Sequence, residues 1–75
     1  MIISGNAFIE FDYVNWRGVE GHREVRAIRV FFGSTEYHKE PQWLMEAWDL
    51  VKQEKRIFSM KDMSNVKDIW GMKYD

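Results

Sequence analysis

The chain has 75 residues, 45% of them hydrophobic, a formal net charge of −1 and no cysteine. Its length allows one domain, which we expect to span residues 1–75. The lack of cysteine excludes disulfides and thiolate metal sites, and the near-neutral charge demands neither nucleic acid nor an anionic membrane as a partner. No apolar run approaches the roughly 20 residues that span a bilayer, and Met1–Asn6 does not have the composition of a signal peptide. We therefore expect a cytoplasmic domain with no membrane partner.

The first predicted strand covers Ala7–Val14. Apolar and acidic side chains alternate along it in the order Ile9, Glu10, Phe11, Asp12, Tyr13. A period of two is typical of a strand with one buried face.

The second predicted strand covers His22–Phe32 and follows a turn over Asn15–Gly21. Its apolar residues change phase, because Val25 and Ala27 share one parity while Ile28, Val30 and Phe32 share the other. Side chains alternate strictly along a regular strand, so this slip predicts a bulge near Ala27–Ile28.

Two more strands are predicted in the second half of the chain. Gln42–Leu50 is apolar on both parities, which indicates a strand that is covered on both sides or that lines a binding surface. Arg56–Met60 follows a charged turn, and Ser64 or Asn65 is a suitable N-cap for a short helix that ends at Trp70. Together these elements predict an all-β, mainly antiparallel domain: a small barrel of four or five strands with a C-terminal turn or helix.

Four segments, in this order, resemble the WYL domain, a family of small SH3-like or Sm-like β-barrels. They are Phe11–Tyr13 with the turn at Gly18, Arg23–Ala27, Gln42–Asp49 and Arg56–Met63. The second is similar to the family's R-x-V-x-P segment. The third is similar to the name-giving tripeptide with its small–aromatic–Asp continuation, and the last to the R-x-F-x-L-D-x-I ending. The resemblance covers Phe8–Val66.

The chain departs from the family pattern at two places. Ala27 stands where the family usually has proline, and the tripeptide reads Gln42-Trp43-Leu44. Most WYL domains follow a DNA-binding winged helix, for which 75 residues leave no room. The resemblance implies a regulatory module that senses a ligand or nucleic acid and whose output is read by a separate partner.

The resemblance also implies a polar ligand site. In the family, basic residues at the positions of Arg23 and Arg56 and the aromatic centre of the tripeptide, here Trp43, are associated with ligand binding. A guanidinium offers a planar fork to phosphate or carboxylate, and an aromatic face stacks a base. The alternative is that Trp43 packs in the core while the arginines pair with acidic neighbours.

Arg26 and Arg29 form a second basic candidate. With a bulge between them, both point away from the core and form a stripe with Arg17 or Lys61 that contacts phosphates. The alternative is an ordinary solvated face balanced by neighbouring glutamates.

Catalytic and metal sites are not predicted. His38 has only Glu36 and Glu40 beside it, a weak set of metal ligands. The serines lie in no G-x-S-x-G context, the glycines form no phosphate-binding loop, and Glu10 and Asp12 share a solvated strand face. We therefore expect neither enzyme activity nor a cofactor.

Two main functions remain open, and an unrecognised hydrolase is a third, weaker alternative. The leading hypothesis is a module that binds a nucleotide, a single-stranded oligonucleotide or another anion. The competing hypothesis is a protein-interaction domain, which meets a separate protein or forms a homodimer. It would use a strand edge or exposed aromatic residues, with Trp16 and Trp70 as the best candidates.

Overall fold

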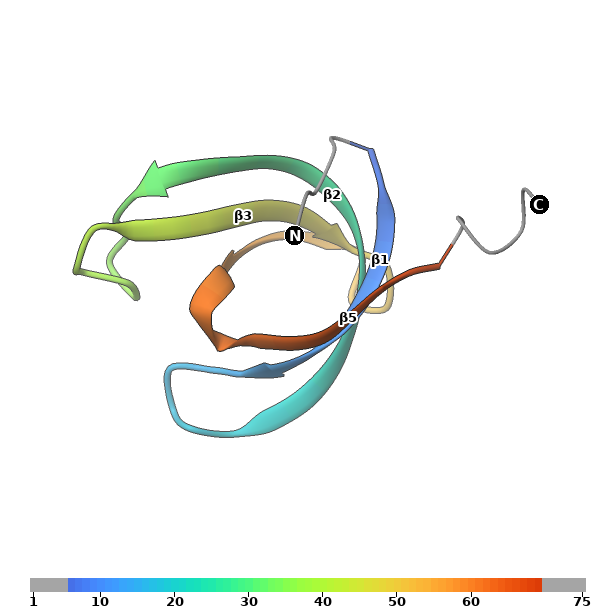
Figure 1. Ribbon diagram of the computed structural model, residues 1–75, viewed down its shortest axis with the longest axis horizontal. Coiled ribbons are helices and arrows are strands. Elements are labelled where there is room, and N and C mark those ends of the chain that lie inside the picture. The colour runs from blue at the N-terminus through green and yellow to red at the C-terminus, as the bar shows by residue number, and fades with distance from the viewer. Residues whose placement is uncertain (1–5, 70–75) are drawn as a thin grey trace.

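The structure is a computed structural model that describes residues 6–69 (Figure 1). Its elements in chain order are β1 (Phe8–Val14), β2 (Glu20–Gly33), β3 (Gln42–Asp49), β4 (Glu54–Ser59), the 3₁₀ turn η1 (Met60–Asp62) and β5 (Met63–Asp68). The strands form one antiparallel sheet in the order β4-β3-β2-β1-β5. The predicted fold class is confirmed. The sheet curls as a barrel does but is not closed, since β4 and β5 remain at its two edges. Within residues 6–69, no helix is long and apolar enough to cross a membrane.

The first strand follows its sequence pattern. Ile9, Phe11 and Tyr13 are buried on the inner face of β1. The Phe58 ring of β4 packs edge-on against the Phe11 and Tyr13 rings, with centroids 5.2 and 5.0 Å away. Aromatic pairs favour this geometry, and the interlocked rings fill the centre of the curled sheet.

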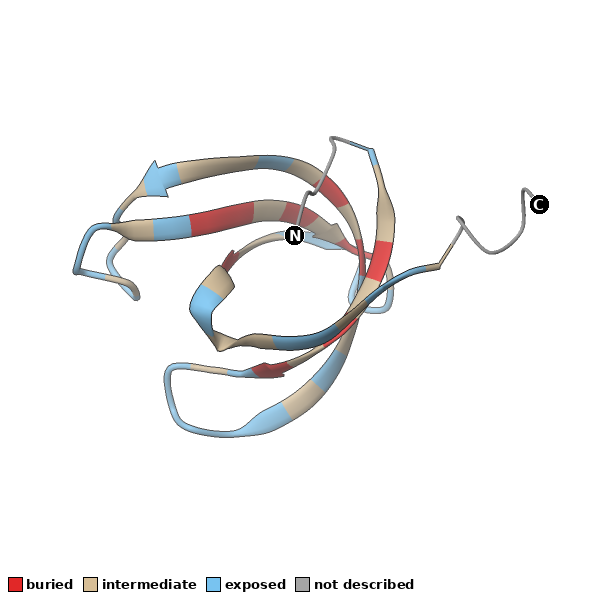
Figure 2. Ribbon diagram, viewed as in Figure 1, coloured by how far each residue is buried: buried red, intermediate tan, exposed pale blue. Residues whose placement is uncertain are grey.

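A bulge divides β2 into two halves. The first half pairs with β1 and the second with β3, and the β2–β3 register shifts between Ala27 and Arg29, as predicted. Val25 and Ala27 are buried before the bulge, and Val30 packs against the core after it. Bulges bend strands and increase their twist, which lets one long strand serve both halves of the sheet. Beyond the bulge, the β2–β3 hairpin projects from the curled part, and its tip carries exposed and half-buried residues (Figures 1 and 2).

The third strand is covered on both faces. Leu44 and Met45 are neighbours in sequence, so they point to opposite sides, and both are fully buried. At the end of β3, the buried Asp49 Oδ1 accepts the N–H groups of Val51 and Lys52 at 3.0 and 2.9 Å. This carboxylate fixes the turn into β4.

The predicted C-terminal helix is wrong. Met63–Asp68 forms β5, which pairs antiparallel with β1. Met63 and Val66 pack against the core, and the outer edge of β1 offers backbone partners that an isolated short helix would not have. Asn65 takes a left-handed φ of 53° near an irregularity in the β1–β5 register rather than at a helix cap. Trp70, the predicted end of the helix, lies outside the described residues.

Candidate ligand-binding site

Strand alternation brings two arginines to the same pair of aromatic rings. Arg23 shares its parity with the buried Val25 and Ala27, and Arg56 shares its parity with the buried Phe58. Both side chains therefore leave the sheet on its inner face. The Arg23 Cζ atom lies 5.9 Å from the centroid of the Tyr13 ring, and the Arg56 Cζ atom lies 6.0 Å from that of Phe58. The two adjacent rings thus carry a guanidinium group each.

Arg23 lacks an acidic partner. Its Nη1 donates to the His22 carbonyl oxygen at 3.2 Å, whereas its buried Nε has no hydrogen-bond partner. No carboxylate within residues 6–69 forms an ion pair with it. The guanidinium lies against Gly21, where a Cβ atom would come within 2.5 Å of Nη1. The lack of a side chain at Gly21 thus makes room for the Arg23 side chain.

Arg56 has a partner that solvent also reaches. Its Nη1 lies 3.4 Å from Glu54 Oε1, and the two side chains are 32% and 56% exposed. Exposed ion pairs contribute about 0–1 kcal/mol, so a ligand anion competes with Glu54 at little cost.

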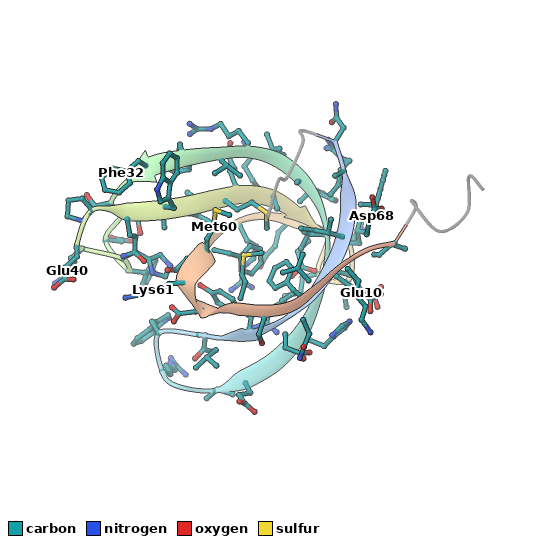
Figure 3. All side chains as sticks on the ribbon, in the orientation of Figure 1. Glu10, Phe32, Glu40, Met60, Lys61 and Asp68 are labelled. Atoms are coloured by element: carbon teal, nitrogen blue, oxygen red, sulfur yellow. The ribbon has the colours of Figure 1, made fainter. Side chains whose placement is uncertain are left out.

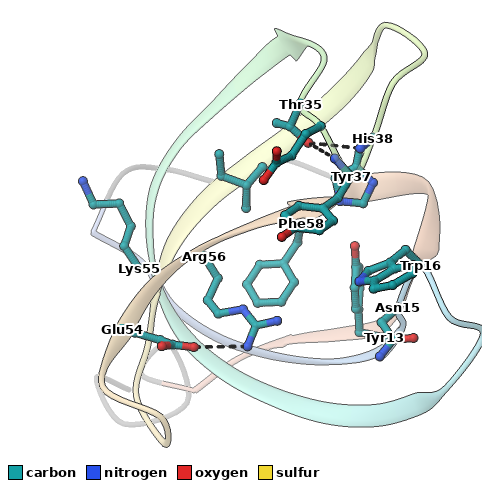
Figure 4. A pocket seen from close by; sticks show the side chains of 12 residues that line it. Tyr13, Asn15, Trp16, Thr35, Tyr37, His38, Glu54, Lys55, Arg56 and Phe58 are labelled. Atoms are coloured by element: carbon teal, nitrogen blue, oxygen red, sulfur yellow. Dashed lines mark hydrogen bonds and ion pairs between the residues drawn. The ribbon is translucent and has the colours of Figure 1, made fainter.

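Arg56 also borders a cleft of about 560 Å³ (Figure 4). The β1–β2 turn, the β2–β3 loop and β4 line it. Its aromatic walls are Tyr13, Trp16, Tyr37 and Phe58. The Trp16 and Tyr37 rings lie 5.9 Å apart at an angle of 31°, and both are more than half exposed. The exposed part of these rings is available for stacking, while the Arg17 Cζ atom lies 4.9 Å from the Trp16 centroid on one face.

Two polar side chains shape the loops that carry Trp16 and Tyr37. Asn15 Oδ1 accepts the N–H groups of Arg17 and Val19 at 2.9 and 3.0 Å, which closes a tight turn around Trp16. Thr35 Oγ1 accepts the N–H groups of Tyr37 and His38 at 3.3 and 3.0 Å (Figure 4). Such local side-chain bonds organise turns. Both rings are therefore held in place rather than carried on unstructured loops.

The Tyr13 hydroxyl lies at the inner end of the site. It accepts the Ser59 N–H at 2.8 Å. Burial raises the pKa of Tyr13, and the Ser59 bond and both arginines oppose that shift only in part. The hydroxyl therefore stays protonated near neutral pH and keeps a proton to donate.

Trp43 lies elsewhere. Its indole is 57% exposed, so the alternative of a core Trp43 is wrong. It packs edge-on against Phe32 at 5.5 Å, on the projecting β2–β3 hairpin, and is not among the residues that line the cleft. The structure thus brings Arg23 and Arg56 to the same pair of adjacent rings without Trp43, and of the two arginines Arg56 lines the cleft whereas Arg23 does not. The tryptophan that lines the cleft is Trp16. Its expected exposure is confirmed. No pattern in the sequence indicates that it lines a cleft with Tyr13 and Tyr37.

Arg26 and Arg29 point outward, as the bulge predicts, but each has a partner of its own. Arg26 Nη1 donates to Asn6 Oδ1 at 2.9 Å, and Arg29 Nε donates to Glu46 Oε1 at 3.0 Å. Neither residue lines the cleft. The expected companions of a basic stripe are engaged elsewhere: Arg17 stacks on the Trp16 ring, and Lys61 borders a neighbouring cleft.

Glu10 and Asp12 of β1 lie close to His22 on the neighbouring strand β2. His22 Nδ1 lies 3.1 Å from Asp12 Oδ1, and His22 Nε2 lies 3.7 Å from Glu10 Oε1. Asn65 Nδ2 donates to Asp12 Oδ2 at 2.8 Å. The bond from Asn65, followed by that from His22, lowers the pKa of Asp12. Residues 6–69 contain no group of three or more His, Asp or Glu side chains arranged to hold a metal ion.

Comparison with known proteins finds no matching family model, no matching curated protein and no matching solved structure. The resemblance to WYL domains therefore stays a prediction that depends on the four sequence segments.

Proposed function

We propose that this chain is a non-enzymatic module that binds a nucleotide or a short single-stranded oligonucleotide in the cleft. The observation that carries the proposal is the placement of Arg23 and Arg56 on the adjacent Tyr13 and Phe58 rings, where the exposed Glu54 pairs with Arg56 and no carboxylate of residues 6–69 pairs with Arg23. An excess of positive charge beside open aromatic faces suits a ligand that is both anionic and planar.

The binding mode follows from the geometry. A phosphate takes the place of Glu54 on Arg56 and draws on the unpaired charge of Arg23. A base stacks on the exposed Trp16 or Tyr37 ring, a contact worth roughly 1–3 kcal/mol per base. Trp16 thus takes the stacking role that the sequence predicted for Trp43.

The regulatory role is also a proposal. The WYL resemblance implies a sensor, and the proposed binding mode includes no covalent step. A separate protein would read the bound state. The cleft is built from two loops and one strand. A ligand that contacts all three restricts their motion relative to one another, and a partner protein can detect that change.

The test is a titration of the isotope-labelled protein with short single-stranded DNA, short RNA and cyclic nucleotides, followed by NMR. We expect shifts of the Trp16 indole and of the Arg56 and Arg23 side chains. The affinity for an oligonucleotide should fall as salt rises, because phosphate contacts release counterions. Shifts confined to Trp43, or none at all, would remove the proposed site.

Charge-removing variants sharpen this test. Arg56→Gln and Arg23→Gln should each weaken binding about tenfold or more, which corresponds to the loss of a charge-assisted hydrogen bond. Arg26→Gln is the matched control, since it removes the same charge from the outer face of β2 and should change affinity by less than about twofold at constant salt.

Gly21→Ala tests position rather than charge. The added Cβ atom must displace the Arg23 guanidinium, whose Nη1 it would otherwise approach to 2.5 Å. We expect weaker binding with the net charge unchanged. Full affinity in this variant would show that the position of Arg23 does not matter.

A further inference from the structure

Among the described residues, one half of β2 has a strand on one side only. Pairing with β1 extends as far as Ala27, whose N–H donates to the Ala7 carbonyl oxygen at 2.8 Å. Asn6 then takes a positive φ of 68°, which turns the chain off the line of β1. After the bulge at Ile28, β2 pairs with β3 on one side from Arg29 to Gly33. No strand within residues 6–69 pairs with Ile28–Gly33 on the other side.

This edge differs from the other open edges of the sheet in its chemistry. The edge of β4 begins with three charged residues, Glu54, Lys55 and Arg56. The edge of β5 ends in Lys67 and Asp68 and contains the left-handed Asn65. Charges and irregularities of this kind protect sheet edges from pairing with other chains. The segment Ile28–Gly33 reads Ile-Arg-Val-Phe-Phe-Gly and has a single charge.

That single charge is already neutralised. Arg29 Nε lies 3.0 Å from Glu46 Oε1, and its Cζ atom lies 4.2 Å above the Phe31 ring. The edge therefore presents β-prone apolar side chains with little net charge, the combination that favours strand addition.

Exposed aromatic residues lie beside the open backbone. Phe32 is 59% exposed and is the register partner of Trp43, and their rings meet edge-on at 5.5 Å. Figure 3 shows Phe32 on the projecting hairpin, on the opposite side of the molecule from Glu10. The binding of an added strand is stabilised by apolar burial and by main-chain hydrogen bonds. Apolar rings next to unpaired backbone groups provide both.

We propose that Ile28–Gly33 pairs antiparallel with the same segment of a second copy, which forms a two-fold symmetric dimer with one continuous sheet. The sequence of the edge is complementary to itself. With the two-fold axis at Val30, Phe32 of each copy lies opposite Ile28 of the other, so that apolar side chains meet on the inner face.

The outer face is also compatible with this register. Arg29 of each copy lies opposite Phe31 of the other, a repeat of the arginine–ring contact that exists within one chain. The two Arg29 side chains are not opposite each other, and each keeps its own Glu46. Like charges therefore do not oppose the pairing. None of the cleft residues belongs to this edge, so the dimer and the ligand site are independent.

The experiment is sedimentation velocity of the full chain from about 1 µM to about 1 mM, together with amide hydrogen exchange at both ends of that range. We expect a monomer at low concentration, a dimer at high concentration, and slower exchange only in the dimer of those Ile28–Gly33 amides that do not bond to β3. The dimerisation constant should change little between 50 mM and 500 mM NaCl, in contrast to oligonucleotide binding.

Phe32→Lys is the variant that blocks the edge. It places a charge on an exposed position, so the free energy of unfolding of the monomer should change little, while the dimerisation constant weakens at least tenfold. Trp16→Lys is the matched control, because it changes an equally exposed aromatic residue of the cleft, and it should dimerise normally.

Three results would overturn the proposal. The chain could stay monomeric over the whole range. The Phe32→Lys variant could dimerise as the parent does, which would assign the dimer to another surface. The amides of Ile28–Gly33 that do not bond to β3 could be protected at every concentration, which would show that a segment of the same chain covers the edge.

Discussion

The molecule has two groups of exposed aromatic residues with different surroundings. In the cleft, Trp16 and Tyr37 lie on loops fixed by polar side chains and close to Arg56. On the projecting hairpin, Phe32 and Trp43 lie beside an open strand edge whose one charge is neutralised. We therefore propose different partners for the same residue types, a small anionic ligand at one place and a protein strand at the other. The two proposals differ because of the neighbouring charges and backbone groups rather than the rings.

The largest expected contrast lies in the contribution of each region to stability. Phe58→Ala removes a fully buried ring from beneath the cleft and should cost about 3–5 kcal/mol, which is comparable to the whole stability of a domain of this size. Phe32→Ala removes an exposed ring and should change the unfolding free energy by about 0.5 kcal/mol or less. Urea denaturation followed by circular dichroism, at a concentration where the chain is monomeric, measures both. Equal losses would mean that the hairpin is part of the core.

The next contrast concerns a buried polar side chain that holds a turn in place. The curled part of the sheet contains one, Asp49. Asp49→Ala leaves the Val51 and Lys52 amides without their acceptor and should cost about 2–3 kcal/mol in urea denaturation. Asp49→Asn keeps an acceptor oxygen and should cost less. A loss below about 0.5 kcal/mol in Asp49→Ala would show that the turn into β4 forms without this carboxylate.

A smaller loss of stability is expected from a change at Tyr13, which is buried in the core and also lines the cleft. Tyr13→Phe leaves the Ser59 N–H without a partner and should cost about 1–2 kcal/mol. It should also weaken ligand binding, because the hydroxyl no longer donates. Tyr37→Phe is the control from the exposed wall of the cleft, and its unfolding free energy should stay within about 0.5 kcal/mol of the parent. If both variants behave alike, the Tyr13 hydroxyl has no structural role.

The smallest effect concerns pH. The pKa of Asp12 is lower in the folded chain than its ordinary value of 3.8, mainly because Asn65 donates to the carboxylate. The unfolded chain thus binds a proton more readily, and the stability that Asp12 contributes near neutral pH is lost as pH falls below about 5 and through the lowered pKa. Asp12→Asn should flatten this acid-side decline in melting temperature. Asn65→Gly keeps the left-handed backbone and should flatten it in part, whereas an unchanged decline in both variants would contradict the assignment.

Much of the fold was predictable because it depends on local alternation. The pattern of Ile9, Phe11 and Tyr13 identified β1, and the parity slip after Ala27 located the bulge. The last strand was not predictable. Ser64 and Asn65 have the same local preferences for a helix cap and for a bulged edge strand, and only the unpaired edge of β1 decides between them.

The site was predictable in part for a similar reason. The resemblance selected Arg23 and Arg56, and the register places both on inner-face rings. It also selected Trp43, which shares its parity with the buried Met45. Alternation gives the face of a residue but not how far along the strand the core extends, so it does not show that Trp43 lies beyond the core. The meeting of Trp16 with Tyr37 joins two loops that are distant in sequence, and local patterns carry no information about such a contact.

The bulge at Ile28 also affects which genetic changes the chain tolerates. Val25 and Ala27 face inward before the bulge and Val30 faces inward after it, so the extra residue keeps two stretches of opposite phase on one side of the sheet. In a regular strand of the same length, every side chain of β2 after Ala27 would turn to the opposite face, and Arg29 would enter the interior. Deletion of Ile28 would leave Ala27 inward, Arg29 outward and Val30 inward without a bulge, so it should keep the faces but remove the bend. Conservative replacement of Ile28 should be tolerated, because the bend depends on the presence of a residue here more than on its identity.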